Sequence, residues 1–357
     1  MKRVLLICPA MPDDMPYMKP YLEYLDSSNI EYDVTYVRNK TEQNKYPSNY
    51  FAYETTTISN NFVRKTFRYC QYSRFVRNQL SKVRYTHIIT MGIACSVFLC
   101  NDLKKNFKGK YIYDIRDYSQ ILRLPIFRHA NNQLLSHSFM NVISSGGFKK
   151  WLPTSVEYIL CHNTTQEKIK EVENIVSDIR SSKPIMILTI GQIRDLDANT
   201  YVIEKLSNNG SFELVFAGKG KTIESLEKMV DERGYTNVIF SGRYKKEEED
   251  IIVKQTNLIN VCMGSNMVSD YLLSNRLYLA ARLKKPLISF SDCYQADVIK
   301  KYNLGVVINR KDNFLEKVQD YISLFNPVKF TQGCSNFLNE VQYDLNTFSQ
   351  QLESFFK

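Results

Sequence analysis

Short apolar runs that alternate with helical patterns constrain the fold of this chain more than any other feature of its sequence. In the first half, strands are expected at Arg3–Cys8, Tyr32–Val37, Thr86–Met91, Lys110–Asp114 and Asn141–Ser144. Apolar strands separated by helices are typical of a parallel sheet with both faces covered. We therefore predict an open, Rossmann-like α/β domain over residues 1–163.

A second series of the same kind follows a polar stretch over residues 164–183, which we interpret as a helical or irregular linker. Its strands are expected at Pro184–Ile190, Phe212–Ala217, Asn237–Ser241, Leu258–Cys262 and Pro286–Phe290. The chain of 357 residues is long enough for a second Rossmann-like domain over residues 184–330. Residues 331–357 show helical spacing, and we expect this helix to pack back toward the first domain.

Composition excludes several classes of protein. The eight cysteines form no CxxC pair and the four histidines have no metal-ligand spacing, so we expect no disulfide set, no metal and no cofactor. No run approaches 18 apolar residues, which argues against a membrane-spanning helix and for a cytoplasmic protein. The net charge of +10 favours an anionic partner: nucleic acid, a phosphorylated substrate or an anionic membrane.

Glycines stand where strands of the second series end: Gly191, Gly218, Gly220 and Gly242. Ligands of open parallel sheets bind beyond the carboxyl ends of the strands. Glycine there lets backbone N–H groups approach a phosphate, and a following helix N-terminus favours the anion. An ordinary strand-to-helix turn explains any one of these glycines equally well, whereas four in this order favour a phosphate site.

The ordered segments around these glycines resemble the donor domain of GT-B glycosyltransferases, especially the family 4-like enzymes of bacterial surface-polysaccharide assembly. They are Gly191-Gln192-Ile193-Arg194, Phe216-Ala217-Gly218-Lys219-Gly220, Gly242-Arg243-Tyr244, Ser274-Asn275-Arg276-Leu277-Tyr278 and Lys285-Pro286-Leu287-Ile288. In the first half, similar segments are Tyr113-Asp114-Ile115-Arg116-Asp117, Val142-Ile143-Ser144-Ser145-Gly146-Gly147-Phe148 and Cys161-His162-Asn163. The resemblance covers roughly residues 1–320.

The resemblance implies two Rossmann-like domains facing each other across a cleft, with a UDP- or GDP-sugar donor bound by the second. Arg194 and Arg276 would contact the diphosphate, because a guanidinium binds phosphate in a bidentate way. Ser274 and Asn275 would add neutral donors. The base would lie against Gly242, Arg243 and Tyr244, and Asp270 would be left to recognise the ribose. Relatives place a ribose-binding glutamate where this chain has Leu279.

Catalysis in such enzymes requires a neutralised leaving diphosphate and, for inversion, a base. The acceptor-side candidates are Asp13, Asp14, Arg116 and Asp117. Each of these acids could equally be a solvated or capping carboxylate. Asp195 and Asp197 have Asp-x-Asp spacing, but GT-B sites work without a metal, and we expect a metal-independent transferase.

A basic, aromatic segment between Asn61 and Tyr85 contains seven Lys or Arg residues and no acid. Its apolar spacing predicts an amphipathic helix, which suggests binding to an anionic membrane surface or a lipid-linked saccharide acceptor. The residues involved would be Arg64, Lys65, Arg68, Arg74 and Arg77. The protein would then be peripheral on the inner face of the cytoplasmic membrane. The alternative is a core-packed helix with a solvated basic face.

Two other functions compete with a transferase that acts in capsule, O-antigen or exopolysaccharide assembly. Leu279 in place of the usual acid suggests a catalytically degenerate scaffold or regulatory protein of the same fold. The charge and tyrosine content suggest a nucleic-acid-binding protein, although no RNP, helix-turn-helix or zinc-finger pattern supports it.

Overall fold

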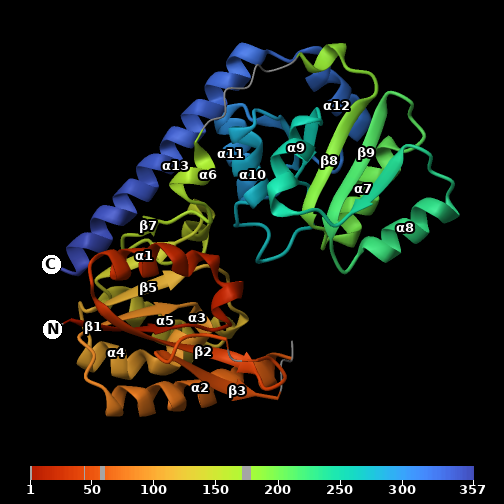
Figure 1. The fold of residues 1–357 in the computed structure, drawn as a ribbon. Helices are drawn as coiled ribbons and strands as arrows, with labels where there is room; N and C mark the ends of the chain where they lie inside the picture. The colour runs from red at the N-terminus through yellow and green to blue at the C-terminus, as the bar shows by residue number, and fades with distance from the viewer. Residues whose placement is uncertain (1, 44, 57–60, 171–177) are drawn as a thin grey trace. The chain divides into compact units, whose positions relative to one another are not determined.

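The computed structural model describes residues 2–43, 45–56, 61–170 and 178–357. The chain divides into two compact units (Figure 1). Unit 1 comprises Met1–Asn163 with Asp344–Lys357, and unit 2 comprises Thr164–Tyr343. Among the helices within the described ranges, none has the length and apolar character needed to cross a bilayer.

Unit 1 is built on a parallel sheet of seven strands in the order β3-β2-β1-β4-β5-β6-β7. The strands are β1 (Arg3–Ile7), β2 (Glu31–Asn39), β3 (Tyr50–Thr55), β4 (His87–Met91), β5 (Tyr111–Ile115), β6 (Met140–Ile143) and β7 (Ile159–Leu160). Its helices are α1 (Lys19–Ser27), α2 (Phe62–Lys82), α3 (Ile93–Ser96), α4 (Cys100–Asn106) and α5 (Pro125–His137). Short 3-10 turns are η1 (Pro12–Asp14), η2 (Pro16–Met18), η3 (Val97–Leu99), η4 (Gln120–Arg123) and η5 (Gly146–Lys150).

Unit 2 is built on a parallel sheet of six strands in the order β10-β9-β8-β11-β12-β13. The strands are β8 (Ile185–Gln192), β9 (Phe212–Lys219), β10 (Val238–Gly242), β11 (Leu258–Asn260), β12 (Leu287–Phe290) and β13 (Gly305–Ile308). Its helices include α7 (Leu196–Leu206), α8 (Ile223–Glu232), α9 (Glu249–Lys254), α10 (Asn275–Arg282), α11 (Tyr294–Tyr302) and α12 (Phe314–Ser323).

The stretch expected to be a linker contains α6 (Gln166–Ile169) and the 3-10 turn η6 (Ile179–Ser181), and its residues 171–177 lie outside the described part. A further 3-10 turn, η7 (Lys246–Glu248), precedes α9.

The two parallel sheets confirm the predicted fold class of two Rossmann-like domains. Three strands at sheet edges were not predicted: β3, β7 and β13. β7 has only two residues. β3 has no buried residue and contains Glu54, so it lacks the apolar run that marks an inner strand. β13 is a four-residue strand that opens with Gly305. Edge strands need less apolar sequence because one side of each has no neighbouring strand.

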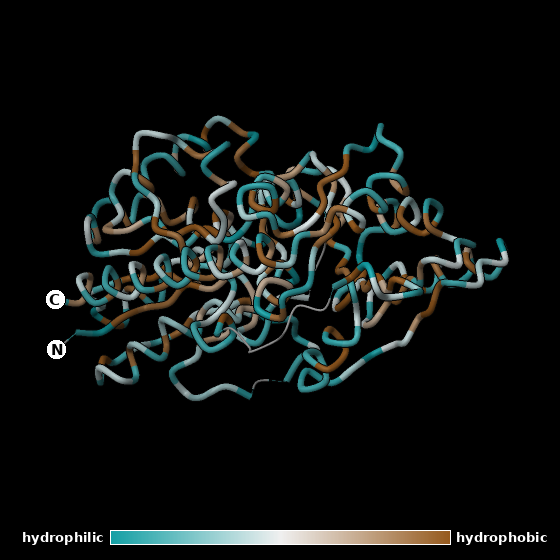
Figure 2. Tube along the Cα trace, turned by 90° about the horizontal axis from the view of Figure 1, so that it is seen from above, coloured by the Kyte–Doolittle hydropathy of each residue, from teal (hydrophilic) through white to brown (hydrophobic). Residues whose placement is uncertain are grey.

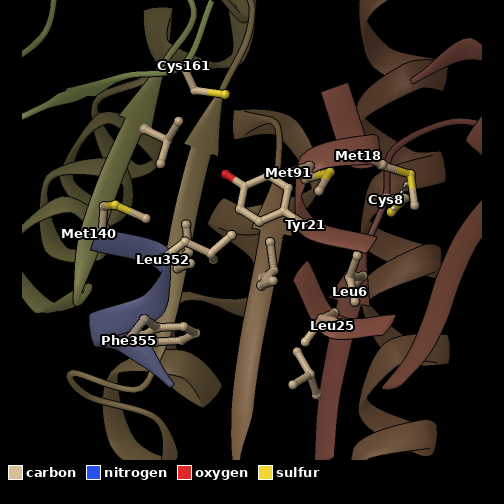
Figure 3. Packing of buried hydrophobic residues seen from close by; sticks show 14 of the residues in the cluster. Leu6, Cys8, Met18, Tyr21, Leu25, Met91, Met140, Cys161, Leu352 and Phe355 are labelled. Atoms are coloured by element: carbon tan, nitrogen blue, oxygen red, sulfur yellow. Dashed lines mark hydrogen bonds between the residues drawn. The ribbon is translucent and has the colours of Figure 1, made fainter. Parts of the chain in front are cut away.

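The long helix α13 (Pro327–Phe355) begins in unit 2 and ends in unit 1. It starts before residue 331, where we expected the last helix to begin. Near its end, Phe348, Leu352 and Phe355 join the core cluster that contains Tyr21 and Leu25 (Figure 3). Hydrophobic and hydrophilic residues alternate along this helix in Figure 2, as one buried face requires.

Candidate functional site

The strand order in unit 2 reverses between β8 and β11, which are neighbours in the sheet but far apart in sequence. Open α/β sheets bind ligands beyond the carboxyl ends of strands at such a switch point. Gly191 is the penultimate residue of β8, Gly218 lies near the end of β9, and Gly242 ends β10. The carboxyl edge of β8 to β11 is therefore the place where this unit can hold a ligand.

Close backbone packing explains two of the glycines at this edge. A Cβ on Gly218 would lie 1.9 Å from the carbonyl oxygen of Gly191. A Cβ on Gly220 would lie 1.6 Å from the carbonyl oxygen of Ile193. Any side chain would push the ends of β8 and β9 apart, so these glycines shape the edge through the packing of the backbone.

Arg276 lies at the switch point itself. Its Nε donates to the carbonyl oxygen of Ile190 at 2.5 Å, and its Nη2 to that of Gln192 at 2.9 Å, both on β8. Its Nη1 donates, at 3.4 Å, to the carbonyl oxygen of Asn260 at the end of β11. A guanidinium has five N–H donors, so one N–H on each terminal nitrogen remains for a ligand.

The charge of Arg276 has no carboxylate partner within the described residues. Burial lowers the pKa of this guanidinium to about 10; the nearby Tyr244 opposes that shift, and the positive charge of Arg194 adds to it. Taking a cation out of water without a counter-ion costs free energy. A bound anion would offset that cost.

Other cations surround Arg276 at this edge. Arg194 is exposed and its Nε donates to Oε1 of Gln192 at 2.8 Å. Arg243, Lys219 and Lys221 are also exposed, and none of them forms an ion pair within the ranges that the structure describes. Sequence analysis did not single out Lys219 or Lys221, although both flank the Gly220 turn.

The N-terminus of α10 lies at the same edge. Ser274 caps the helix, its Oγ accepting from the backbone N–H of Arg276 at 3.3 Å. Asn275 is the first helical residue and is exposed. The positive end of the helix dipole favours an anion at this position.

Tyr244 lies beside the end of β8. A Cβ built on Gly191 would be 3.8 Å from its hydroxyl oxygen, and that hydroxyl donates to Oε1 of Glu249 at 3.1 Å. Burial and the negative charge of Glu249 raise the pKa of Tyr244 to about 12, so the phenol is neutral at physiological pH. Its ring is partly exposed and flanks the strand ends.

Two acids of this unit are engaged in local structure. Asp195 caps α7, its Oδ1 accepting from the N–H of Ala198 at 3.0 Å, and its Oδ2 accepts from the N–H of Gly264. Asp270 accepts from Ser265 Oγ at 3.2 Å and from the N–H of Asn266 at 2.9 Å. Both carboxylates therefore hold the loop after β11.

Leu279 is 9% exposed and is one of the buried residues of α10. The described ranges contain no cluster of three His, Cys, Asp or Glu side chains able to hold a metal ion.

In unit 1, Arg116 is 5% exposed and forms a bidentate pair with the fully buried Asp114. Its Nε and Nη2 donate to the two carboxylate oxygens at 2.5 and 2.7 Å. Tyr21 donates to the same carboxylate at 2.7 Å. Burial alone lowers the pKa of Arg116, but the charge of Asp114 and its hydrogen bonds raise it above the ordinary value.

The second terminal nitrogen of Arg116 donates to the carbonyl oxygen of Cys161 at 2.8 Å and to Oδ1 of Asn163 at 3.1 Å. Arg116 is thus tied to the segment that directly follows β7. Asp114 was missed by sequence analysis. Residues two apart at a strand end point the same way, which is the signal that could have indicated the pair.

The remaining acids of unit 1 lie at the carboxyl edge of its sheet. Asp117 follows β5 and is exposed. Asp13 and Asp14 are exposed in η1, after β1. Asp13 pairs with Lys45, and this hydrogen bond lowers the pKa of its carboxyl.

The basic segment forms α2, whose buried side is Tyr69, Tyr72, Ser73, Val76 and Gln79. Arg64, Lys65 and Arg74 are exposed, and Arg68 lies 5.1 Å from the ring centroid of Tyr69. Arg77 is bound to Asp102 at 2.9 Å and to the carbonyl oxygen of Phe98. Two large apolar side chains, Val63 and Phe67, are 70% and 63% exposed near the start of the helix.

Solved structures share this fold. Sucrose-phosphate synthase from Thermosynechococcus elongatus aligns with a TM-score of 0.70 at 12% identity, covering 100% of this chain and 98% of its own. The lipopolysaccharide outer core galactosyltransferase WaaB in its apo form aligns with a TM-score of 0.67 at 15% identity, covering 99% of each chain. HepE from Anabaena, in complex with UDP and glucose, aligns with a TM-score of 0.65 at 10% identity, covering 99% of this chain and 100% of its own.

These similarities define the chain as a protein with the GT-B fold of glycosyltransferases. No family model matches the sequence, and no curated protein is significantly similar to it. At these identities the likeness establishes the fold, and the activity has to be argued from the site.

Proposed function

We propose that the protein is a glycosyltransferase that binds a UDP- or GDP-sugar at the β8/β11 edge of unit 2. The observation that carries this proposal is Arg276, a half-buried cation that has three carbonyl partners and two N–H groups left for an anion. Arg194, Lys219 and the N-terminus of α10 add positive potential at the same edge. A diphosphate is the group that such a site fits best.

The other parts of the donor follow from the same edge. The base lies against Gly242, Arg243 and Tyr244, where a neutral, partly exposed ring is available for stacking. Ser274 and Asn275 give neutral hydrogen bonds to the phosphates. Leu279 is buried, and the Asp270 carboxylate accepts hydrogen bonds from Ser265 and Asn266 of its own loop. Neither side chain is therefore placed to bind the ribose, which is held mainly by backbone groups.

In the reaction, an acceptor hydroxyl oxygen bonds to the anomeric carbon while the bond from that carbon to the diphosphate oxygen breaks. The electron pair leaves with the diphosphate, whose charge Arg276 and Arg194 neutralise. Asp117, the exposed carboxylate after β5, is the acceptor-side group that would take the hydroxyl proton. Arg116 holds Asp114 and the neighbouring loops and is a positioning residue.

The acceptor is a lipid-linked saccharide of surface-polysaccharide assembly, and the protein meets it at the inner face of the cytoplasmic membrane. The support is the exposed start of α2, where Val63 and Phe67 stand beside Arg64 and Lys65. Exposed apolar side chains next to cations favour binding to an anionic bilayer surface. Salt-sensitive binding to anionic vesicles supports this role, whereas equal binding to neutral vesicles at high salt contradicts it.

Melting temperatures in the presence of UDP, GDP and CMP test the donor site. One nucleotide diphosphate should raise the melting temperature, and Arg194→Ala should weaken its binding by about 1.5–3 kcal/mol, or roughly 10- to 150-fold. The matched control is Arg233→Ala, an exposed arginine at the end of α8 that pairs with Glu204. An unchanged shift in Arg194→Ala would refute the role of that residue.

Enzymatic activity needs its own measurement. Hydrolysis of a nucleotide-sugar, or transfer from it in isolated membranes, is the expected result. Binding of UDP or GDP without either reaction would favour a non-catalytic protein of the same fold. Greater stabilisation by RNA than by either nucleotide would favour nucleic-acid binding.

A further inference from the structure

Three aromatic side chains stand at the carboxyl edge of the sheet in unit 1, each after a different strand. Tyr17 lies in η2 after β1, Tyr118 follows β5, and Trp151 follows β6 at the end of η5. All the strands of this sheet are parallel, so these loops share one edge. Sequence analysis assigned none of the three a role.

Trp151 and Tyr118 form a pair. Their ring centroids are 5.3 Å apart with the planes at 88°, an edge-to-face arrangement. On another side, the ring of Trp151 lies 5.5 Å from that of Phe148, which is 2% exposed and belongs to the core. Trp151 and Tyr118 are each partly exposed, so the buried Phe148 supports an aromatic surface that solvent can reach.

The indole N–H of Trp151 is buried and has no hydrogen-bond partner within the described residues. A buried indole N–H normally finds a partner, because leaving it unpaired costs free energy. This donor therefore has no acceptor among the described residues and is available to a ligand hydroxyl.

A carboxylate accompanies the rings. Asp117 directly precedes Tyr118 and is exposed. Burial and then the negative charge of Asp114 raise the pKa of the Tyr17 phenol, and the positive charge of Arg116 opposes that shift. The guanidinium carbon of Arg116 lies 4.8 Å from the centroid of the Tyr17 ring.

We propose that Tyr118 and Trp151 bind a pyranose ring of the acceptor, with Asp117 accepting hydrogen bonds from its hydroxyls. This inference rests on the proposed transferase function. One face of a pyranose carries mainly C–H groups and covers an aromatic ring well, whereas its rim of hydroxyls needs polar partners. The two rings provide the apolar surface, and Asp117, the carboxylate that would take the acceptor proton, provides the polar partner.

The sequence supplies a direct probe, because Trp151 is the single tryptophan of the chain. Its emission should change in a saturable way when methyl glycosides of glucose, galactose, mannose or N-acetylglucosamine are titrated, for at least one of them. Mannitol, a polyol without a ring, is the control and should give no change. Tyr118→Ala should weaken the response at least tenfold.

Tyr343→Ala is the matched control variant, because Tyr343 is a 70% exposed tyrosine of α13 and should leave the titration unchanged. No response to any of the glycosides, in a protein whose melting temperature still rises with UDP or GDP, overturns the inference and leaves the proposed donor site intact. Equal responses in the wild type and in Tyr118→Ala overturn it as well. Absence of any nucleotide shift instead counts against the proposed function itself.

Discussion

Arg116 of unit 1 and Arg276 of unit 2 each lie at the carboxyl edge of a parallel sheet, but they have opposite electrostatic surroundings. Arg116 follows β5 and faces the buried carboxylate of Asp114 in a bidentate pair. Arg276, at the start of α10, donates to three backbone carbonyls and meets no carboxylate within the described residues. The first cation is neutralised by the protein, and the second is the one that we propose binds the diphosphate.

The comparison shows that residue type and a location at the carboxyl edge of a sheet do not by themselves indicate a binding role. Both arginines belong to the sequence segments on which the predicted resemblance to GT-B glycosyltransferases rests. What differs is one acid, Asp114, placed two residues before Arg116. A buried cation with a carboxylate partner stabilises the fold, whereas a cation with only dipoles around it gains stability from an anion.

The largest expected effect is on the stability of unit 1. Arg116→Ala leaves the fully buried Asp114 without its cation, and losing one partner of a buried pair costs about 3–5 kcal/mol. Urea unfolding followed by far-UV circular dichroism measures the loss. Arg233→Ala, which removes an exposed pair, should unfold like the wild type. A loss as small as that of the control would mean that Asp114 does not depend on Arg116.

Arg276→Gln should affect nucleotide binding more than it affects the stability of the fold. No buried acid is left unpaired, so the loss of stability should be smaller, about 1–2 kcal/mol for the missing hydrogen bonds. The stabilisation by UDP or GDP should disappear. Thermal melts with and without nucleotide check both statements. If Arg276→Gln unfolds as readily as Arg116→Ala and is still stabilised by nucleotide, then Arg276 has the structural role and not the ligand-binding one.

Inorganic pyrophosphate, which has no base or sugar, should stabilise the wild type through Arg276, Arg194 and the other cations of this edge. At a hundredfold excess over its Kd, a ligand adds about 2.7 kcal/mol of stability. Sodium chloride at matched ionic strength is the control, and Arg276→Gln should lose the effect. The lowered pKa of Arg276, about 10, still lies above neutral, so the group stays charged. The effect should therefore not fall between pH 7 and pH 9.

The smallest effects concern α2, where paired and unpaired cations lie on one helix. Removing Arg64 or Lys65 should weaken binding to anionic vesicles by about 1 kcal/mol each. Arg77→Ala should matter less for binding, because Arg77 is held by Asp102 and the carbonyl oxygen of Phe98. Vesicle co-sedimentation at low salt measures the difference. Equal losses for Arg64 and Arg77 would show that pairing on this helix is irrelevant.

Much of the fold could be predicted from local pattern. The inner strands β1, β4, β8 and β9 are continuous apolar runs, and buried parallel strands require such runs. The edge strands β3, β7 and β13 were not predicted, although the edge strand β10 was. β3 has no buried residue, and β7 and β13 are only two and four residues long. The start of α13 at Pro327 was missed for a similar reason: the early part of the helix carries exposed residues such as Val328.

For the candidate site, the sequence allowed a prediction of which residues take part but not of which groups they contact. Sequence alone indicated glycines at strand ends and arginines suited to phosphate, because those requirements are local. The pairing of Arg116 with Asp114 and Tyr21, and the three carbonyls around Arg276, depend on how separate strands and helices pack. The free energy of a charge is set by the groups within a few ångströms, and the tertiary structure alone decides which groups those are.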